Sequence, residues 1–308
     1  TAWNPDVQGS VRTIAVSGNT IYAGGGISYV GGQARNKIAA INATTGIPTA
    51  WNPNANSYVY SIAVSGTTIY VGGGFSSIGG QTRNNIAALD AATGNATTWN
   101  PNANDRIVSL TISGTTVYAG GAFSTIGGQA RGKIAAIDAT SGMATAWNPN
   151  ANNLVSTISI SGTDVYAGGV FTTISGEKRN YIAAIDVTNS TPLAWNPNAG
   201  NYVEFITVAG TTVYAGGGFT TVGGQSRNRI AAIDAVTGVP TTWNPNADNL
   251  VRSIAVSGTT VYVGGDFTTI GGQTRNRIAA LDGTTGVPTA WDPNANGDVY
   301  ALALSGTT

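Results

Sequence analysis

The sequence contains no cysteine and no histidine, and only 9% of its 308 residues are charged. Without Cys and His the chain has no disulfides, no thiol nucleophile, no Cys/His zinc site and no Ser-His-Asp triad. No stretch approaches 18 consecutive apolar residues, so we expect no membrane-spanning helix. The chain begins at Thr1 without a Met, signal or transit segment, which predicts a start that has been processed or cut.

An excess of charge of either sign is also missing, because 14 Lys and Arg residues balance 14 Asp and Glu residues. A neutral chain has no global field that attracts polyanions, so we expect neither a nucleic-acid partner nor insertion into a membrane. Glycine is abundant instead, at 43 residues, and 42% of the residues are hydrophobic. This composition indicates a folded all-β protein rather than a helical or disordered chain.

An internal repeat of 48 residues runs through the whole chain. The step is set by the tryptophans, and the seven of them are Trp3, Trp51, Trp99, Trp147, Trp195, Trp243 and Trp291. A tyrosine column keeps the same step, at Tyr22, Tyr70, Tyr118, Tyr166, Tyr214 and Tyr262. Six full periods are followed by a 20-residue copy of the beginning, since residues 289–308 match residues 1–20.

Four short strands are expected in each period. In the second copy they cover 58–64, 68–71, 85–89 and 96–99, and Pro101 ends the last one because proline cannot donate to a ladder. A lone sheet of this size cannot bury both faces, whereas stacked copies bury them against one another. Four strands in an even period are typical of β-propeller blades.

We therefore predict a single all-β propeller domain over residues 1–308. Its six complete blades are expected at about 11–53, 59–101, 107–149, 155–197, 203–245 and 251–293. A partial blade would combine 299–308 with 1–5, which leaves open a propeller of six or seven blades or an open, filamentous array. An unpaired strand at the incomplete blade predicts self-association by strand addition.

Two family resemblances rest on the most regular part of the repeat. The run Ile-Ala-Ala-Leu-Asp-Ala-Ala-Thr-Gly at 86–94, followed by Trp99 and preceded by Val-Gly-Gly-Gly-Phe at 71–75, resembles the delta-60 repeat of bacterial secreted and surface propellers. This resemblance covers the whole chain and implies a secreted or cell-surface location. The Ala-x-Asp-x-x-Thr-Gly…Trp part also resembles the tryptophan-docking motif of quinoprotein propellers, although the spacing between Gly94 and Trp99 is one residue longer.

The quinoprotein resemblance implies an enzyme with a quinone cofactor and calcium on the propeller axis. Such a site needs a unique cluster of acidic, amide and basic residues, but the copies here are near-duplicates. We therefore expect no enzyme, no catalytic residues and no cofactor.

The recurrent residues are expected to be structural. A tryptophan in every copy is interpreted as a plug between neighbouring blades, with the alternative of a ligand-stacking platform as in a multivalent lectin. An arginine column at Arg35, Arg83, Arg131, Arg179, Arg227 and Arg275 accompanies an aspartate column at Asp90, Asp138, Asp186, Asp234 and Asp282, with Asn42 in the first copy. These columns predict either charge-assisted pairs or aspartates that cap turns.

One segment has the start of a calcium loop, D-x-N-x-N-G. Its candidate metal ligands are Asp292, Asn294, Asn296 and Asp298. The twelfth position is Ala303, where a bidentate Glu is expected, so an Asx turn is the alternative interpretation.

The columns that vary between copies lie just before and within the first strand of each period. We expect them to gather near the axis as a ring that binds a ligand, with relaxed constraint as the alternative. The candidate residues are Tyr58, Tyr60, Arg106, Leu154, Tyr202, Glu204, Leu250, Arg252, Asp298 and Tyr300. Asp266, in a varying column after the paired glycines, is expected to face the same place.

These observations predict a non-enzymatic extracellular or cell-surface module that binds protein or glycan in adhesion, or a structural unit of a larger surface protein. Tyr and Arg are common interface anchors, which favours such partners. The alternatives are a multivalent lectin with one site per blade and a quinoprotein-like enzyme.

Overall fold

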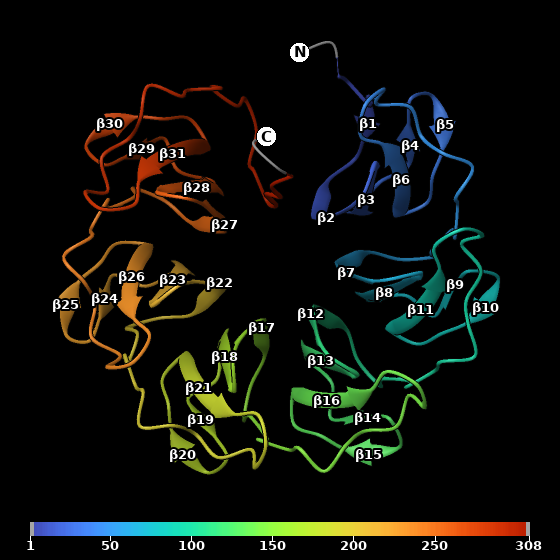
Figure 1. Cartoon of the computed structure of the whole chain (residues 1–308), viewed down its shortest axis with the longest axis horizontal. Helices are drawn as coiled ribbons and strands as arrows, with labels where there is room; N and C mark the ends of the chain where they lie inside the picture. The colour runs from blue at the N-terminus through green and yellow to red at the C-terminus, as the bar shows by residue number, and fades with distance from the viewer. Residues whose placement is uncertain (1–2, 306–308) are drawn as a thin grey trace. The chain divides into compact units, whose positions relative to one another are not determined.

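The computed structural model describes residues 3–305, and this part of the chain consists of β-strands, turns and loops without a helix. It therefore offers no helix that is long and apolar enough to cross a membrane. The chain divides into two compact units, Thr1–Asn148 and Pro149–Thr308, called unit 1 and unit 2 below. Each unit holds three copies of the repeat, which Figure 1 colours from blue to green and from green to red.

Each copy forms a three-stranded antiparallel sheet, whose strands we name A, B and C in chain order. The A strands are β2 (Val11–Ser17), β7 (Val59–Ser65), β12 (Ile107–Ser113), β17 (Val155–Ser161), β22 (Val203–Ala209) and β27 (Val251–Ser257). The B strands are β3 (Thr20–Gly25), β8 (Thr68–Gly73), β13 (Thr116–Gly121), β18 (Asp164–Gly169), β23 (Thr212–Gly217) and β28 (Thr260–Gly265). The C strands are β6 (Ile38–Asn42), β11 (Ile86–Asp90), β16 (Ile134–Asp138), β21 (Ile182–Asp186), β26 (Ile230–Asp234) and β31 (Ile278–Asp282).

A small hairpin lies between the B and C strands of every copy, and the sequence did not predict it. The six hairpins are β4 (Tyr29–Val30) with β5 (Gln33–Ala34), β9 (Ser77–Ile78) with β10 (Gln81–Thr82), β14 (Thr125–Ile126) with β15 (Gln129–Ala130), β19 (Thr173–Ile174) with β20 (Glu177–Lys178), β24 (Thr221–Val222) with β25 (Gln225–Ser226), and β29 (Thr269–Ile270) with β30 (Gln273–Thr274). Gly79 and Gly80 turn the second one at φ 61° and 75°, as a two-residue type I′ turn requires. Two-residue strands are too short to show a period of two. In the first copy β1 (Val7–Gln8) also pairs with β4.

The predicted fourth strand is reduced to one bridge. In the second copy Ala96 bridges Leu89, and the Thr97 amide donates to the Ala88 carbonyl over 2.9 Å. Proline occupies the bridging position in four other copies and cannot donate to a ladder, which limits the pairing. The blades are thus four-stranded, with a minimal last strand.

Every A strand carries a β-bulge at the same place. In β7, Val59 pairs with Gly73 and Ser61 pairs with Gly72, so Tyr60 is an extra residue outside the ladder. The same register shift recurs in β2, β12, β17, β22 and β27. A bulge leaves one residue unpaired and redirects its side chain.

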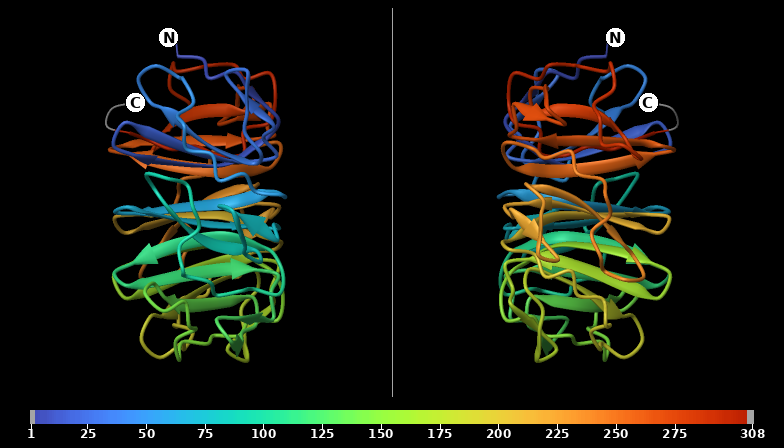
Figure 2. Two further views of the ribbon diagram at one scale, coloured as in Figure 1. Left: turned by 90° about the vertical axis from the view of Figure 1, so that its right-hand side faces the viewer. Right: turned by 90° about the vertical axis from the view of Figure 1, so that its left-hand side faces the viewer.

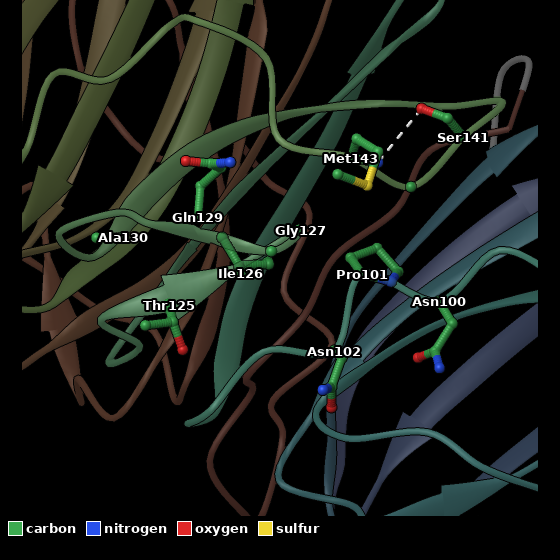
Figure 3. Close-up of a pocket in the computed structure, with 12 residues that line it drawn as sticks. Asn100, Pro101, Asn102, Thr125, Ile126, Gly127, Gln129, Ala130, Ser141 and Met143 are labelled. Atoms are coloured by element: carbon green, nitrogen blue, oxygen red, sulfur yellow. Dashed lines mark hydrogen bonds between the residues drawn. The ribbon is translucent and has the colours of Figure 1, made fainter.

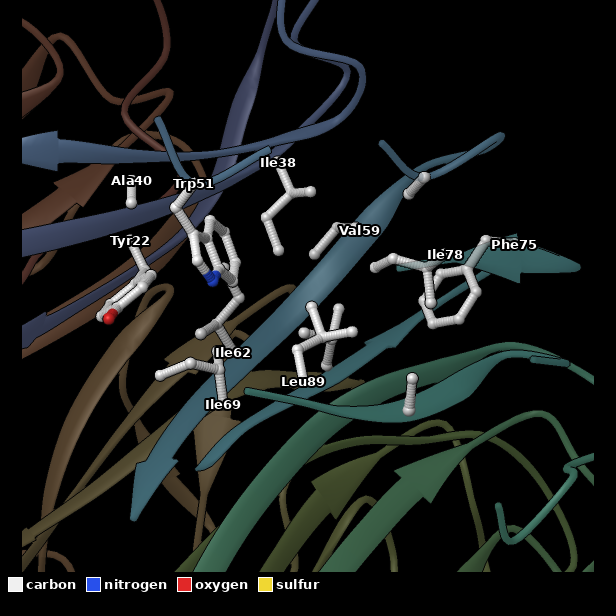
Figure 4. Close-up of a cluster of buried hydrophobic side chains, with 13 residues drawn as sticks. Tyr22, Ile38, Ala40, Trp51, Val59, Ile62, Ile69, Phe75, Ile78 and Leu89 are labelled. Atoms are coloured by element: carbon white, nitrogen blue, oxygen red, sulfur yellow. The ribbon is translucent and has the colours of Figure 1, made fainter. Parts of the chain in front are cut away.

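The sheets within each unit stack with their A strands in contact, β2 against β7 and β7 against β12 in unit 1 (Figure 2). Trp51 seals the first of these seams and is only 4% exposed. Its ring lies 5.1 Å from that of Tyr22 in a T-shaped pair, and its Nε1 donates to the Asp90 carbonyl over 3.0 Å. Figure 4 shows Trp51 among side chains of both copies, including Ile38 and Ile62. The interpretation of the tryptophans as plugs between blades is confirmed.

The arginine and aspartate columns serve separate purposes. Arg83 donates from Nη1 to the Thr82 carbonyl (2.8 Å) and from Nη2 to the Thr97 carbonyl (2.6 Å), which ties the hairpin to the bridging strand. Asp90 accepts from the Thr93 amide (2.7 Å) and hydroxyl (2.8 Å), so it caps the turn that follows its C strand. Of the two interpretations of the aspartates, the turn cap is correct.

The aspartate caps predict how stability depends on pH. Hydrogen bonds from the side chain and backbone of Thr93 lower the pKa of Asp90. Equivalent hydrogen bonds lower the pKa values of the other four aspartates of the column. A lowered pKa contributes stability that is present above the unfolded value of about 3.9 and is lost as the pH falls through the folded value. Below about pH 4 the melting temperature should therefore fall.

Asn42 supplies the control for this prediction, because it caps the first copy with a neutral amide through the amides of Thr44 (2.9 Å) and Thr45 (2.8 Å). A variant with all five aspartates changed to asparagine should keep its turns and lose much of the acid dependence. Thermal melts of both proteins between neutral pH and about pH 2.5 make the comparison. If the melting temperatures of the two proteins fell equally as the pH is lowered, the aspartate caps would not be the cause of the acid dependence.

Residues 299–305 form no strand but repeat the contacts of an A strand. The Leu302 amide donates to Ser253 Oγ over 2.9 Å, as the Leu110 amide does to Ser61 Oγ. The Val299 amide donates to the Gly265 carbonyl over 3.1 Å. This segment lies where the start of a further blade is predicted, and residues 1–2 and 306–308 of that prediction lie outside the described residues.

Candidate functional site

The bulges explain where the copies differ in sequence. Tyr60, Glu204 and Arg252 are the extra residues of β7, β22 and β27, so the ladder does not restrict their side chains. The second varying column precedes the strand and is held by its backbone: the Tyr58 carbonyl accepts from the Gly74 amide over 2.9 Å. Both columns lie at the end of the sheet where the A strand begins, called the bulge end below. Variation there leaves the sheet intact.

The ten predicted residues divide between the two units. Unit 1 contains Tyr58, Tyr60 and Arg106. Unit 2 contains Leu154, Tyr202, Glu204, Leu250, Arg252, Asp298 and Tyr300.

In unit 1 the bulge end of the second copy presents two stacked tyrosines. The rings of Tyr58 and Tyr60 lie 6.0 Å apart at an interplanar angle of 10°, and Tyr58 is 43% exposed. Lys37 Nζ lies 5.8 Å from the centroid of the Tyr58 ring, within the range of a cation–π contact. Arg106 is exposed in the third copy, with its backbone amide 2.6 Å from Asp105 Oδ1.

In unit 2 the structure brings Glu204, Arg252, Asp266 and Tyr300 together. Arg252 binds Asp266 through two bonds of 2.6 Å, from Nε and Nη2, and Glu204 through one bond of 2.8 Å from Nη1. Its guanidinium also lies 5.1 Å from the Tyr300 ring centroid. The hydrogen bonds to Asp266, helped by the charge of Glu204, raise the pKa of Arg252 above its ordinary value. The expectation that Asp266 faces the same place as the variable columns is met within this unit.

Removing the arginine from this cluster should destabilise the protein. Arg252→Ala leaves two neighbouring carboxylates without their cation, and partial exposure limits the loss to about 1–2 kcal/mol. Arg252→Ala combined with Glu204→Gln and Asp266→Asn should recover much of it, because the repulsion is gone. Urea unfolding midpoints at neutral pH test both variants, and equal midpoints for the single and triple variants would contradict the ion-pair explanation.

The remaining predicted residues of unit 2 do not join the cluster through a side chain. Leu154 and Leu250 supply carbonyls to the amides of Val170 and Asp266, each over 2.9 Å. Tyr202 covers Gly218, where an added Cβ would meet its Cε1 at 2.4 Å. Asp298 accepts from Arg277 Nε over 3.2 Å.

Three of the four predicted calcium ligands, Asp292, Asn294 and Asp298, contact other side chains through their oxygens, and Asn296 is exposed. Asp292 Oδ2 lies 3.9 Å from Arg275 Nη1, and Asn294 Oδ1 accepts from Asn276 Nδ2 over 2.6 Å. Asn294 has φ 54°, the left-handed conformation of an Asx-type connection. Among residues 3–305 no three His, Cys, Asp or Glu side chains are grouped to hold a metal ion. These contacts favour an Asx turn over a calcium loop for this segment.

The prediction from the sequence did not include one varying column at the bulge end. It follows the asparagine or glycine after the arginine column and consists of Lys37, Asn85, Lys133, Tyr181, Arg229 and Arg277. All six are left-handed, with φ between 64° and 68°. The signal was available, because the column varies between constant neighbours, the same criterion that identified the other candidates.

A pocket of about 400 Å³ lies in unit 1 near the small hairpin of the third copy (Figure 3). Its walls come from residues 100–102, from β14 and β15, and from residues 141–143, with Met143 at the rim. The Met143 amide donates to Ser141 Oγ over 3.3 Å. The lining includes amide and hydroxyl side chains but no charged one.

Comparisons with known proteins identify the fold. The family profile described as "Outer membrane protein assembly factor BamB" matches residues 1–218, and one described as "Domain of unknown function (DUF5122) beta-propeller" matches residues 260–282. No curated protein sequence matches significantly. The all-β architecture and these propeller profiles confirm a β-propeller of about six repeats, whereas the delta-60 assignment stays a prediction.

Solved structures agree at the level of the fold. A crystal structure of the computationally designed Ika8 protein is 15% identical, with a TM-score of 0.62 over 97% of this chain and 92% of that chain. The WD40 propeller domain of Doa1 is 12% identical, with a TM-score of 0.67 over 97% and 87%. A chain of the mitotic checkpoint complex is 14% identical, with a TM-score of 0.68 over 98% and 86%.

Proposed function

Since this chain belongs to the family described as outer membrane protein assembly factor BamB, we propose that it is a non-enzymatic module that binds a protein partner at the bulge ends of its blades. The observation that carries the proposal is the division between constant and varying residues. The constant tryptophans, arginines and aspartates are used in seams, hairpins and turns. Variation is concentrated at residues such as Tyr60 and Arg252, which are the extra residues of β-bulges and do not pair with a residue of the neighbouring strand.

The proposal includes a location in the bacterial envelope or outside the cell. The description of the matching family names the outer membrane, and the resemblance to secreted and surface propellers points in the same direction. Tyrosine and arginine at the bulge ends are residue types enriched in protein interfaces, which supports a protein partner over a purely structural module.

Site-specific crosslinking tests this function. A photoreactive amino acid is placed at Tyr60, on the bulge end, or at Gln81, which is exposed on the small hairpin β10 of the same copy. In cells of the source organism, position 60 should give a crosslinked band of defined mass and position 81 should not. Equal crosslinking from both positions, or none from position 60, would argue against a bulge-end partner.

Self-association is a second proposal, favoured by residues 299–305. This segment lies where a further A strand would lie, through the bonds of Val299 and Leu302 described above. Its outer edge has no strand partner among the described residues, and exposed edges accept strands. A concentration-dependent mass in sedimentation, abolished by Leu302→Pro, is the expected result, and a monomer at all concentrations would contradict it.

A further inference from the structure

The chain is neutral in total, but its two units have net charges of opposite sign. Unit 1 contains seven basic and four acidic residues, a net charge of +3. Unit 2 contains seven basic and ten acidic residues, a net charge of −3. A local excess of one sign attracts partners of the other sign even when the chain as a whole is neutral.

The excess of unit 1 is concentrated at its bulge ends. Arg35, Arg83 and Arg131 are held by backbone carbonyls of the hairpins and bridging strands. Asp90 and Asp138 cap turns, whereas Asp105 lies at the bulge end and accepts from the Arg106 amide. The other basic residues of unit 1 all lie at or beside the starts of A strands, and they are Arg12, Lys37, Arg106 and Lys133.

Lys37 and Lys133 occupy a backbone conformation that disfavours them. Their φ angles are 68° and 66°, in the left-handed region where a long side chain is disfavoured and asparagine is better tolerated. The same blades contain another left-handed column, which has Asp6 at its first position and asparagine at the six later ones, Asn54, Asn102, Asn150, Asn198, Asn246 and Asn294. In the column of Lys37 only one copy has asparagine, Asn85, while four have Lys or Arg. Strained backbone positions cluster at active and ligand-binding sites.

These basic groups face the candidate site. Lys37 lies over the Tyr58 ring. Lys133 lies beside Arg106, because both contact Ala122: Lys133 Nζ donates to its carbonyl over 2.8 Å, and the Arg106 carbonyl accepts from its amide. Among residues 3–305, Lys37, Arg106 and Lys133 form no ion pair. In unit 2, Arg252 pairs with Glu204 and Asp266 and Arg277 pairs with Asp298, whereas Arg229 donates to the Gly218 carbonyl as Lys133 does to that of Ala122.

We propose that the bulge end of unit 1 binds an acidic peptide segment of the partner protein, with Lys37, Arg106 and Lys133 supplying the positive charge. The inference rests on the proposed function and names the chemistry of its partner. Tyr60 stacks on the Tyr58 ring and Lys37 lies over it, which places an ammonium group beside two phenols. A carboxylate-rich chain needs only the ammonium, guanidinium and phenol groups present here.

Binding of a fluorescein-labelled oligoglutamate peptide to the full chain, followed by anisotropy at low and high salt, is the test. The double variant Lys37→Asn/Lys133→Asn should weaken binding about two- to five-fold for each charge removed. The asparagines match Asn85, so we expect the variant to fold and to melt no lower than the parent. Asn85→Lys should tighten binding by a similar factor, and Lys178→Asn, in the exposed hairpin strand β20 of unit 2, should not change it.

Three results would overturn the proposal: no binding of oligoglutamate above an oligoglutamine control, unchanged affinity in both the double variant and Asn85→Lys, or tighter binding of polygalacturonate than of the peptide. The last result would identify an acidic glycan instead. Crosslinking from position 60 distinguishes the proposal of a protein partner from the proposal that this partner binds through an acidic segment. A protein crosslink together with failed peptide binding would reject the acidic segment and leave the protein-binding function standing.

Discussion

Trp51→Ala is expected to lower the free energy of unfolding by about 3–5 kcal/mol, the usual loss for a large aromatic removed from a core. Trp51 is 4% exposed and belongs to two copies at once, through the Tyr22 ring on one side and the Asp90 carbonyl on the other. Its removal leaves a cavity at a seam between sheets, which neighbouring strands cannot fill without separating the copies. The midpoint of urea unfolding is the measurement.

Trp291→Ala is the matched control for this result. Trp291 has the same place in the repeat and the same T-shaped contact, with Tyr262 at 5.5 Å, but it is 44% exposed. Its loss should therefore cost much less, about 1 kcal/mol. Equal losses for the two variants would show that the tryptophans act within their own blade and not as plugs between blades.

Gly72→Val is expected to destabilise the protein by about 3 kcal/mol, near the upper end for overpacked cores. A Cβ at Gly72 would lie 2.7 Å from Ile107 Cγ2 of the next copy, and the Ile107 Cβ would follow at 3.1 Å. The two sheets must move apart to admit a valine, because both sides of this contact are fully packed.

Gly74→Val, two residues further along, separates this packing effect from any loss of strand or turn propensity. Gly74 has only Tyr60 Cε2 at 3.8 Å and Ser57 Oγ at 3.9 Å near its virtual Cβ, and valine already occupies the equivalent place as Val170. The control should change the midpoint of urea unfolding by less than about 0.5 kcal/mol. If it destabilised as strongly as Gly72→Val, the close approach between sheets would not be the cause.

The repeat made most of the fold predictable. Each A, B and C strand lies within two residues of its expected place, because apolar runs separated by turn residues repeat in register six times. The hairpin at Gly79 and Gly80 was missed because its strands have two residues each, and the fourth strand was overestimated because only one of its residues bridges. Strands of two residues and single bridges are too short to produce an alternation of apolar and polar residues in the sequence.

The candidate site was only partly predictable for a related reason. Comparing copies identified Tyr60, Glu204 and Arg252 as irregular, but not that all three are bulge residues. Nor did it show that Arg252 is held by Asp266, directly after the neighbouring strand β28, while Lys37 has no carboxylate partner among residues 3–305.

By itself, the sequence determined the period, the propeller blades and the structural use of the tryptophans, because repeated burial requires repeated apolar residues at constant spacing. Only the tertiary structure decided which varying residues face one another, which charges are neutralised and which lysines are held in a left-handed conformation. These properties depend on distances between atoms in different strands, and one-dimensional spacing does not encode them.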